Sequence, residues 1–218
     1  MIISIKRTLL GLVVTLLAAC ATPRNYDYTA LQQSKPRSIL VLPPLNQTPD
    51  THATYSVLST VTQPLAESGY YVFPVALVDQ TFKENGLANP DEMHQASIDK
   101  LREIFGADAV LYLTVTQYGT SYKVVISDVV VSVTARLVDA RTGQLLWDGS
   151  ASASQAQNNN NSGGGLAGML IKAVVEQIVN NVKGDAASHP IARLASTNLL
   201  SAKAGGLLYG PRSPMYGK

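Results

Sequence analysis

The sequence predicts one α/β domain, at residues 38–202, built on a mixed sheet of five strands. Short apolar runs alternate with segments in which apolar residues recur every three or four positions, the pattern of strands joined by helical crossovers. From residue 109 onward, three strand-like runs follow one another without an intervening helix. We therefore expect the first three strands to be parallel neighbours and the last three to form an antiparallel meander.

The first two strands are expected at 38–44 and 70–78. The run SILVLPP at 38–44 is apolar and ends at two prolines, and YYVFPVALV at 70–78 is apolar almost throughout. Between them, apolar residues at 57–65 have helical spacing, and Pro64 predicts a kink or an early end of that helix. A short helix after the second strand should stop at Gly86.

The segment from Asn89 to Gly106 carries a strong helix signature. Asn89 can cap the helix, Pro90 suits the first helical position, and Glu92 completes the spacing of a capping box. Gly106 can end the helix, and alternating apolar residues at 109–115 then predict the third strand.

The fourth and fifth strands are expected at 122–138 and 145–153. Apolar residues change from even to odd positions near Asp128, which indicates a β-bulge there. The turn between these two strands contains Gly143 at a position that requires a positive φ. The residues expected at the buried centre of the sheet are Val41, Leu111, Leu113, Val129, Val131, Val133 and Trp147.

A helix expected at 165–182 is apolar on almost every side except one polar stripe. This apolar surface is wider than one sheet face requires, so we expect part of it to join a second copy of the chain or a partner protein. The alternative is that a second helix at 190–202 covers the excess near Ile191 and Leu194. Residues 203–218 have no periodicity and are expected to be a disordered tail. The candidate interface residues are Leu166, Met169, Leu170, Val174, Val175 and Ile178.

The N-terminus is typical of an exported bacterial protein. Two basic residues precede an apolar run at 9–17, which is too short to span a bilayer. The sequence LAAC, ending at Cys20, resembles the bacterial lipobox, in which the cysteine is acylated and becomes the first residue of the mature chain. We expect a signal peptide at 1–19, lipid on Cys20 and a lipidated tether at 20–37; the alternative is an ordinary signal peptide that leaves a spare thiol.

The residue after Cys20 is Ala21 and not aspartate. Gram-negative lipoproteins that resemble this one are then usually passed to the outer membrane. We therefore expect the domain on the periplasmic face of that membrane or exposed at the cell surface, held there through lipid alone.

The mature chain would carry no net charge. Two of the seventeen Lys and Arg residues lie in the signal, and the other fifteen balance fifteen acidic residues, so 15 − 15 = 0. Without a basic stripe there is no electrostatic basis for binding nucleic acid. A single cysteine also allows no internal disulfide and no Cys-x-x-Cys pair.

The sequence offers few candidates for catalysis. The stretch from Gly163 to Gly168 fits G-x-G-x-x-G, but an asparagine-rich loop separates it from the preceding strand. A flexible loop is the favoured interpretation, and an envelope enzyme or nucleotide-binding protein is the alternative. Asp91 and His94 could form one edge of a metal site, but no third ligand is near them in the sequence. We expect no metal, no cofactor and no enzymatic activity.

Several phrases resemble known envelope lipoproteins. SILVLPPLNQT and LREIFGADAVLYLTV resemble parts of the TolB N-terminal-like α/β domain, and VDARTGQLLWDG is similar to a hairpin of the curli-secretion lipoproteins. Together with GYYVFPV and NPDEMHQAS, these phrases make residues 20 to about 185 similar to a family of bacterial lipoproteins that includes a conserved meningococcal surface-antigen candidate.

This resemblance implies a three-layer α/β/α sandwich. It also implies a binding or scaffold role, as an accessory component of an envelope transport or secretion system beside a curli-secretion-like lipoprotein. The family carries no established catalytic residues. The chain lacks the long inserted hairpins of the curli-secretion pore proteins, so we do not expect it to form a pore alone.

Overall fold

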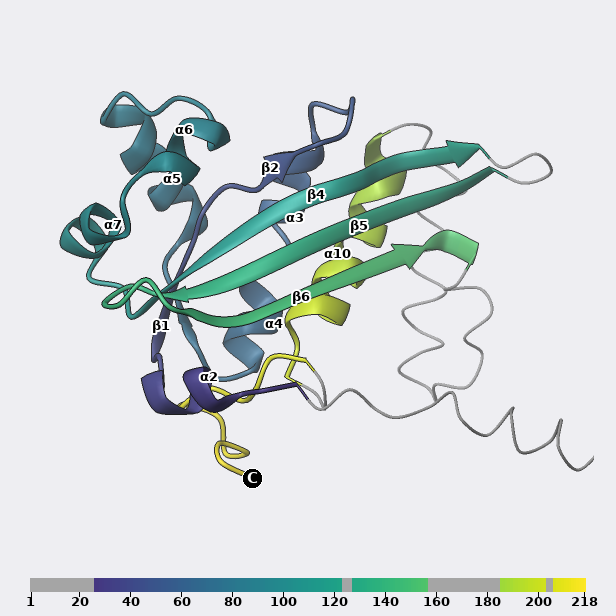
Figure 1. Ribbon diagram of the computed structural model, residues 1–218. Helices are drawn as coiled ribbons and strands as arrows, with labels where there is room; N and C mark the ends of the chain where they lie inside the picture. The colour runs from purple at the N-terminus through teal and green to yellow at the C-terminus, as the bar shows by residue number, and fades with distance from the viewer. Residues whose placement is uncertain (1–25, 123–126, 157–184, 203–205) are drawn as a thin grey trace, which may run out of the picture.

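The computed structural model describes residues 26–122, 127–156, 185–202 and 206–218. Six strands form one mixed sheet (Figure 1): β1 (Ser38–Val41), β2 (Leu45–Asn46), β3 (Tyr71–Val72), β4 (Ala109–Tyr122), β5 (Ser127–Asp139) and β6 (Leu145–Ser154). The main path has the order β3-β1-β4-β5-β6, and β2 pairs with β4. The pairing is parallel from β3 through β1 to β4 and antiparallel from β4 to β6, which confirms the predicted topology. β2 is a sixth strand, which the sequence analysis did not predict.

The long hairpin of β4 and β5 differs from the strand expected at 122–138. Tyr122 ends β4 and pairs with Ser127 at the start of β5, while 123–126 lie outside the described residues. Asp128 sits in a regular pair, so the predicted bulge there is wrong, and the irregularity lies in the middle of β4 instead. Across this hairpin the buried Tyr118 of β4 pairs with the buried Val131 of β5, so the inward-facing positions have even numbers before the reversal and odd numbers after it.

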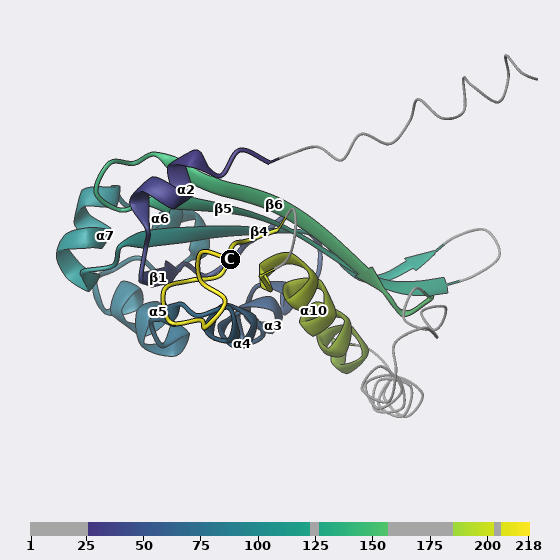
Figure 2. The same ribbon diagram turned by 90° about the horizontal axis from the view of Figure 1, so that it is seen from below.

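Three helices lie side by side along one face of the sheet (Figure 2): α3 (Ala53–Leu58), α4 (Thr62–Glu67) and α10 (Asp185–Leu200). They close a large apolar core. This core contains six of the seven residues expected at the centre of the sheet, and the seventh, Val129, is half-buried at its margin.

The kinked helix expected at 57–65 is in fact two helices. α3 ends at Leu58 and α4 begins at Thr62, so the break precedes Pro64. Pro64 is the third residue of α4. The N–H groups of a first helical turn have no intrahelical acceptor, so a proline there costs no backbone hydrogen bond.

A second helical layer covers the other face of the sheet near β1. It consists of α5 (Val75–Glu84), α6 (Pro90–Gln95) and α7 (Ile98–Phe105), which enclose a smaller core with Leu40 and Leu42. The sheet therefore lies between two helical layers, and the expected three-layer α/β/α sandwich is confirmed.

The strand expected at 70–78 is much shorter in the structure. Only two residues pair as β3, and Pro74 then caps the start of α5. Proline has a fixed φ and no N–H to lose, which suits the first turn of a helix. Val78 and Phe82, four residues apart, are buried on the inner side of α5.

The helical segment between Asn89 and Gly106 is divided in two. Ala96 and Ser97 are extended, and the Ser97 side chain caps α7. The Asn89 side chain accepts the N–H of Glu92 at 3.0 Å, and the Glu92 carboxylate accepts the N–H of Ala88, one residue before the cap, at 3.0 Å. The predicted cap at Asn89 is thereby confirmed, and so is the end at Gly106, whose φ is +65°; the return bond of Glu92 differs from a standard capping box by one residue.

Both terminal segments pack on the domain, contrary to the predictions. Helix α2 (Thr29–Ser34) lies in the tether expected at 20–37, and the described part of the tail expected at 203–218 is also packed. Leu31 and Leu207 are 3% and 1% exposed and belong to the larger core. Burial of these apolar side chains supplies the free energy that orders both segments.

Helix α10 is longer than the helix expected at 190–202 and contains Pro190. Its Ile191 is buried in the core between α10 and the sheet, where α10 contacts β5 and β6. The helix expected at 165–182 lies outside the described residues. None of the helices in the described ranges is long and apolar enough to cross a membrane.

Candidate functional site

Most residues predicted to carry function lie outside the described part of the chain. These are the lipidation residue Cys20, the loop from Gly163 to Gly168, and the interface residues Leu166, Met169, Leu170, Val174, Val175 and Ile178.

Of the described polar residues, His94 and Asp108 have structural partners, whereas Asp91 faces solvent. Asp91 is exposed, and His94 is half-buried with Nε2 at 2.9 Å from the carbonyl oxygen of Pro43. Asp108 accepts hydrogen bonds from the N–H and the hydroxyl of Ser38, both at 3.1 Å. Within the described ranges, no group of three His, Cys, Asp or Glu side chains could hold a metal ion.

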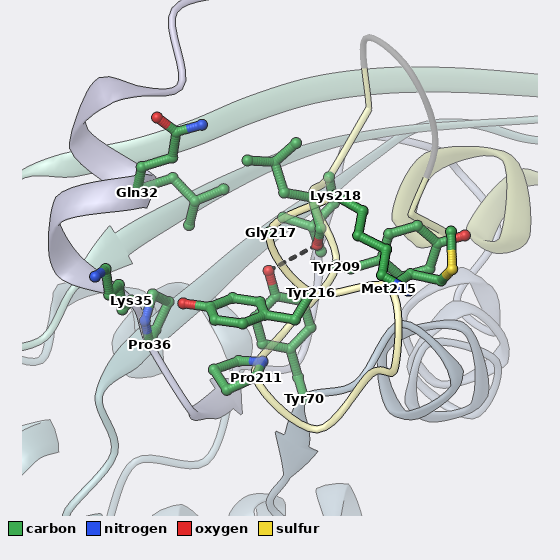
Figure 3. A pocket seen from close by; sticks show the side chains of 13 residues that line it. Gln32, Lys35, Pro36, Tyr70, Tyr209, Pro211, Met215, Tyr216, Gly217 and Lys218 are labelled. Carbon is green, nitrogen blue, oxygen red and sulfur yellow. Dashed lines mark hydrogen bonds between the residues drawn. The ribbon is translucent and has the colours of Figure 1, made fainter.

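A cavity of about 750 Å³ lies between α2 and the C-terminal segment, residues 206–218. We call it the terminal pocket. Figure 3 shows Lys35 and Pro36 on the side of α2, facing Tyr216 of the C-terminal segment, with Tyr70 beside Tyr216. Most of the lining surface is apolar. A concave, mainly apolar cavity of this size is typical of sites that bind small molecules.

The C-terminal segment is fixed to the turn before β3. The Gly210 N–H donates to the Ser68 carbonyl oxygen at 2.8 Å, and the Arg212 N–H donates to the Gly69 carbonyl oxygen at 3.0 Å. Gly69 has a φ of +96°, and a Cβ there would lie 2.5 Å from the backbone nitrogen of Ser213. Glycine therefore serves two purposes at this turn: it allows the left-handed conformation and the close approach of the C-terminal segment.

On the opposite wall, α2 is tied to the end of β5 through Asp139. The Ser34 hydroxyl donates to this carboxylate at 2.5 Å, and the N–H groups of Arg141 and Thr142 donate at 2.7 and 3.0 Å. Burial alone would raise the pKa of Asp139, but these hydrogen bonds, led by that from Ser34, hold the pKa below its usual value. The carboxylate stays ionised and keeps α2 in place.

Two tyrosines connect the start of the described chain to the rest of the domain. The Tyr26 hydroxyl donates to the Asp148 carboxylate on β6 at 2.9 Å and accepts the N–H of the same residue at 2.8 Å. The Tyr28 hydroxyl donates to the carbonyl oxygen of Gly206. The N-terminal and C-terminal segments are thus joined directly at the terminal pocket.

The lining of the terminal pocket suits binding better than catalysis. The Tyr70 hydroxyl donates to the Leu208 carbonyl oxygen at 2.8 Å (Figure 3), and burial, assisted by Tyr216, raises the pKa of Tyr70 above its usual value. This phenol is therefore neutral and already engaged. Among the described residues lining the pocket, Lys35 and Lys218 carry the charged side chains, and none is an aspartate, glutamate, histidine or cysteine.

Sequence reasoning missed this pocket because both of its walls were expected to be unstructured. One signal was available: the C-terminal segment, residues 206–218, contains Leu207, Leu208, Tyr209 and Tyr216. Disordered segments are poor in large apolar and aromatic residues. No local pattern, however, indicates that this segment meets α2, from which it is separated by almost the whole chain.

A three-layer α/β domain, preceded by a sequence that resembles a lipobox, defines the class of bacterial α/β lipoproteins. The family model described as "Putative lipoprotein GNA1162-like" matches residues 26–212, and the chain belongs to this family. The family expected from the resemblance is thereby confirmed.

The chain is similar to one curated protein and to several solved structures. The chain is 49% identical over 211 residues to "Putative lipoprotein NMB1124/NMB1162" of Neisseria meningitidis serogroup B, covering 95% of this chain and 96% of the relative. The crystal structure of lipoprotein GNA1162 from Neisseria meningitidis is similar with 54% identity and a TM-score of 0.53, covering 66% of this chain and 99% of that chain. The PelC dodecamer from Paraburkholderia phytofirmans is a more distant match, with 15% identity, a TM-score of 0.44, and 77% and 88% of the two chains covered.

Proposed function

We propose that the protein is a lipid-anchored binding or scaffold module on the periplasmic face of the outer membrane, and an accessory component of an envelope transport or secretion system. Membership of a lipoprotein family supports the anchor. The observation that supports the proposal is the packing of the chain from Tyr26 onward, because only a short stretch of sequence separates this packed segment from Cys20.

The distance follows from the length of the connection. Six residues lead from Cys20 to Tyr26. A fully extended chain of this length spans at most about 20 Å. The Tyr26 side chain is hydrogen-bonded to Asp148 on β6, and α2 begins three residues later at Thr29. An acylated Cys20 therefore holds the terminal pocket near the bilayer surface. A domain held in this way can present a surface to other envelope proteins.

The anchor is tested with the Cys20→Ser variant of the full chain. Serine has no thiol, so incorporation of labelled palmitate and retention through lipid should both be lost. Ala21→Asp is the matched control, because it leaves Cys20 intact and should keep the acyl group. Cys20→Ser protein that still incorporates palmitate would contradict the anchor.

The same control tests the location. In Gram-negative lipoproteins that resemble this one, an aspartate directly after the acylated cysteine prevents transfer to the outer membrane. Ala21→Asp should therefore move the protein from the outer-membrane to the inner-membrane fraction of a sucrose gradient. An unchanged distribution would contradict the proposed sorting to the outer membrane.

The partner surface is proposed on the segment 165–182, through the apolar positions that include Met169 and Val175. Met169→Lys or Val175→Lys should abolish association with a second copy of the chain or with a curli-secretion-like lipoprotein, because a charge in an apolar interface is costly. Asn180→Lys, on the polar stripe of the same segment, is the control and should leave association unchanged.

Association is measured by light scattering of the purified protein and by co-purification from membrane extracts. Thermal unfolding of each variant checks that the domain remains folded. The proposed interface would be contradicted if the unsubstituted protein is monomeric and has no partner. It would also be contradicted if the Met169→Lys and Val175→Lys variants associate as well as the unsubstituted protein.

A further inference from the structure

We propose that the terminal pocket binds one long acyl chain of a membrane lipid, with the anionic end of that lipid at Lys35. The inference rests on the proposed function in one respect: it requires that the pocket be held near a bilayer. The ligand class follows from the lining, the charge and the position of the pocket.

The lining selects an apolar ligand. The pocket of about 750 Å³ has a mainly apolar surface. The apolar lining side chains that remain accessible are Met215 and Tyr216, which are 44% and 41% exposed, and the half-buried Leu208 and Tyr209. Leu31, Tyr70 and Leu207 lie behind them, are at most 4% exposed and form the floor of the pocket. A flexible hydrocarbon chain gains affinity with every CH₂ group that such a surface removes from water.

The charged side chains favour an anionic head group. Lys35 supplies an ammonium group, and the described lining residues include no aspartate or glutamate. Lys35 is exposed at the end of α2 in a left-handed conformation with a φ of +48°. An ammonium at the mouth of an apolar cavity attracts the phosphate or carboxylate of a lipid whose chain enters the cavity.

The position of the pocket supplies the acyl chain. The Tyr28 hydroxyl donates to the carbonyl oxygen of Gly206, which precedes the lining residues of the C-terminal segment. The pocket therefore adjoins the part of the chain that leads to Cys20. Acyl chains are available there from two sources, the anchor on Cys20 and the phospholipids around it.

A crosslinking experiment on the full chain in its own membrane tests the inference. Cells are fed palmitate that carries a diazirine and an alkyne, and the cells are then irradiated. The crosslinked peptides are mapped by mass spectrometry. Crosslinks are expected on the peptide that contains α2 and on the C-terminal segment 206–218. Crosslinks spread evenly over the surface, or absent from both peptides, would overturn the proposal.

A matched pair of variants shows whether the crosslinks come from inside the pocket. Gln32 and Gln33 are neighbouring exposed residues of α2, and only Gln32 lines the pocket. Gln32→Trp places a bulky ring in the cavity and should reduce the crosslinks several-fold, because the ring takes space that the acyl chain needs. Gln33→Trp should leave them unchanged. Equal yields from the two variants, with equal melting temperatures, would overturn the proposal.

A second pair examines the head group. Lys35→Glu reverses the charge at the pocket and should reduce the crosslinks several-fold, whereas Arg37→Glu, at an exposed residue that does not line the pocket, should not. A Lys35→Glu protein that crosslinks like the unmodified chain would exclude the anionic head group from the proposal.

The mass of the crosslinked adduct on the unmodified chain separates the two sources of the acyl chain. A phospholipid mass on the pocket peptides assigns the chain to a surrounding lipid, as proposed. A crosslink between a pocket peptide and the Cys20 peptide assigns it to the anchor, which carries no anionic head group, and overturns the head-group part of the proposal. The same samples distinguish failure of this inference from failure of the proposed function. Acylated Cys20 without pocket crosslinks overturns only the present inference, and pocket crosslinks without acylation overturn only the anchor.

Discussion

His94 lies half-buried where α6 meets the loop after β1, with its ring edge against Tyr112 at a centroid distance of 5.4 Å. Burial disfavours the protonated ring and lowers the pKa of His94, although the hydrogen bond to the Pro43 carbonyl oxygen and the charge of Asp91 oppose this effect. The residue is therefore neutral and structural at pH 7. At the scale of single residues, a side chain that could have been one edge of a metal site instead attaches a helix to the sheet.

This burial predicts a dependence of stability on pH. The pKa of His94 is lower in the folded state than the unfolded value of 6.5, so the unfolded chain takes up the proton first as the pH falls. The free energy of unfolding should then decrease between about pH 7 and pH 5. Urea unfolding across this range measures the slope, and His94→Gln should flatten it. A slope that survives in His94→Gln would contradict the assignment.

At the scale of elements, β5 separates a buried face from an exposed one. Val131 and Val133 are 0% and 1% exposed in the larger core, whereas Thr134 and Arg136 are exposed on the opposite face. This alternation is the period-2 pattern of a strand with one face in the core. The helical layer of α5, α6 and α7 covers that second face near β1, so the polar residues of β5 remain accessible beyond it.

Paired substitutions on β5 test which face is buried. Val131→Asp places an unpaired charge in the core and should lower the free energy of unfolding by roughly 4 kcal/mol or more, enough to unfold a domain of ordinary stability. Thr134→Asp, three residues along the same strand, should cost no more than about 1 kcal/mol. Chemical denaturation monitored by circular dichroism compares the two. Comparable losses would mean that the buried face is wrongly assigned.

Local signals in the sequence predict the elements whose causes are local. The cap at Asn89 and the stop at Gly106 were predictable because all the atoms involved lie within a few residues. The helix expected to stop at Gly86 is present as α5, but its first turn, residues 75–78, was assigned to the preceding strand, because a run rich in valine and leucine fits either structure and only the N-cap at Pro74 decides between them. The reversal between Tyr122 and Ser127 was mistaken for a bulge, since both exchange the inward-facing residues.

At the scale of the whole molecule, the two terminal segments complete the domain together. Tyr28 bonds to the C-terminal segment, Leu31 and Leu207 join one core, and the C-terminal segment lies beside α2 in Figure 1. The family match at 26–212 begins where the described packing begins and includes α2 and much of the C-terminal segment. This contact could not be predicted from the sequence, because it joins segments that carry no common local pattern and meet only in the folded chain.

The attachment of the C-terminal segment makes Gly69 the most informative position for a test of this architecture. A Cβ at Gly69 would lie 2.5 Å from the Ser213 backbone nitrogen and 2.8 Å from the Gly210 carbonyl oxygen, and its φ of +96° strains any other residue. Gly69→Ala should therefore cost roughly 3 kcal/mol, the sum of backbone strain and displacement of the segment. Gly86→Ala is the matched control, because Gly86 has a φ of +83° and no heavy atom within 4 Å of the added Cβ.

In the control Gly86→Ala, only backbone strain should lower the free energy of unfolding, by about 1 kcal/mol. Urea unfolding measures both losses, and limited proteolysis measures how readily the C-terminal segment is released. Gly69→Ala should expose cleavage sites in that segment, since the hydrogen bonds to Ser68 and Gly69 cannot form when the segment is pushed away. Gly86→Ala should not. If both variants lose the same free energy and resist the protease equally, the C-terminal segment is not held against this turn, and the terminal pocket loses one of its walls.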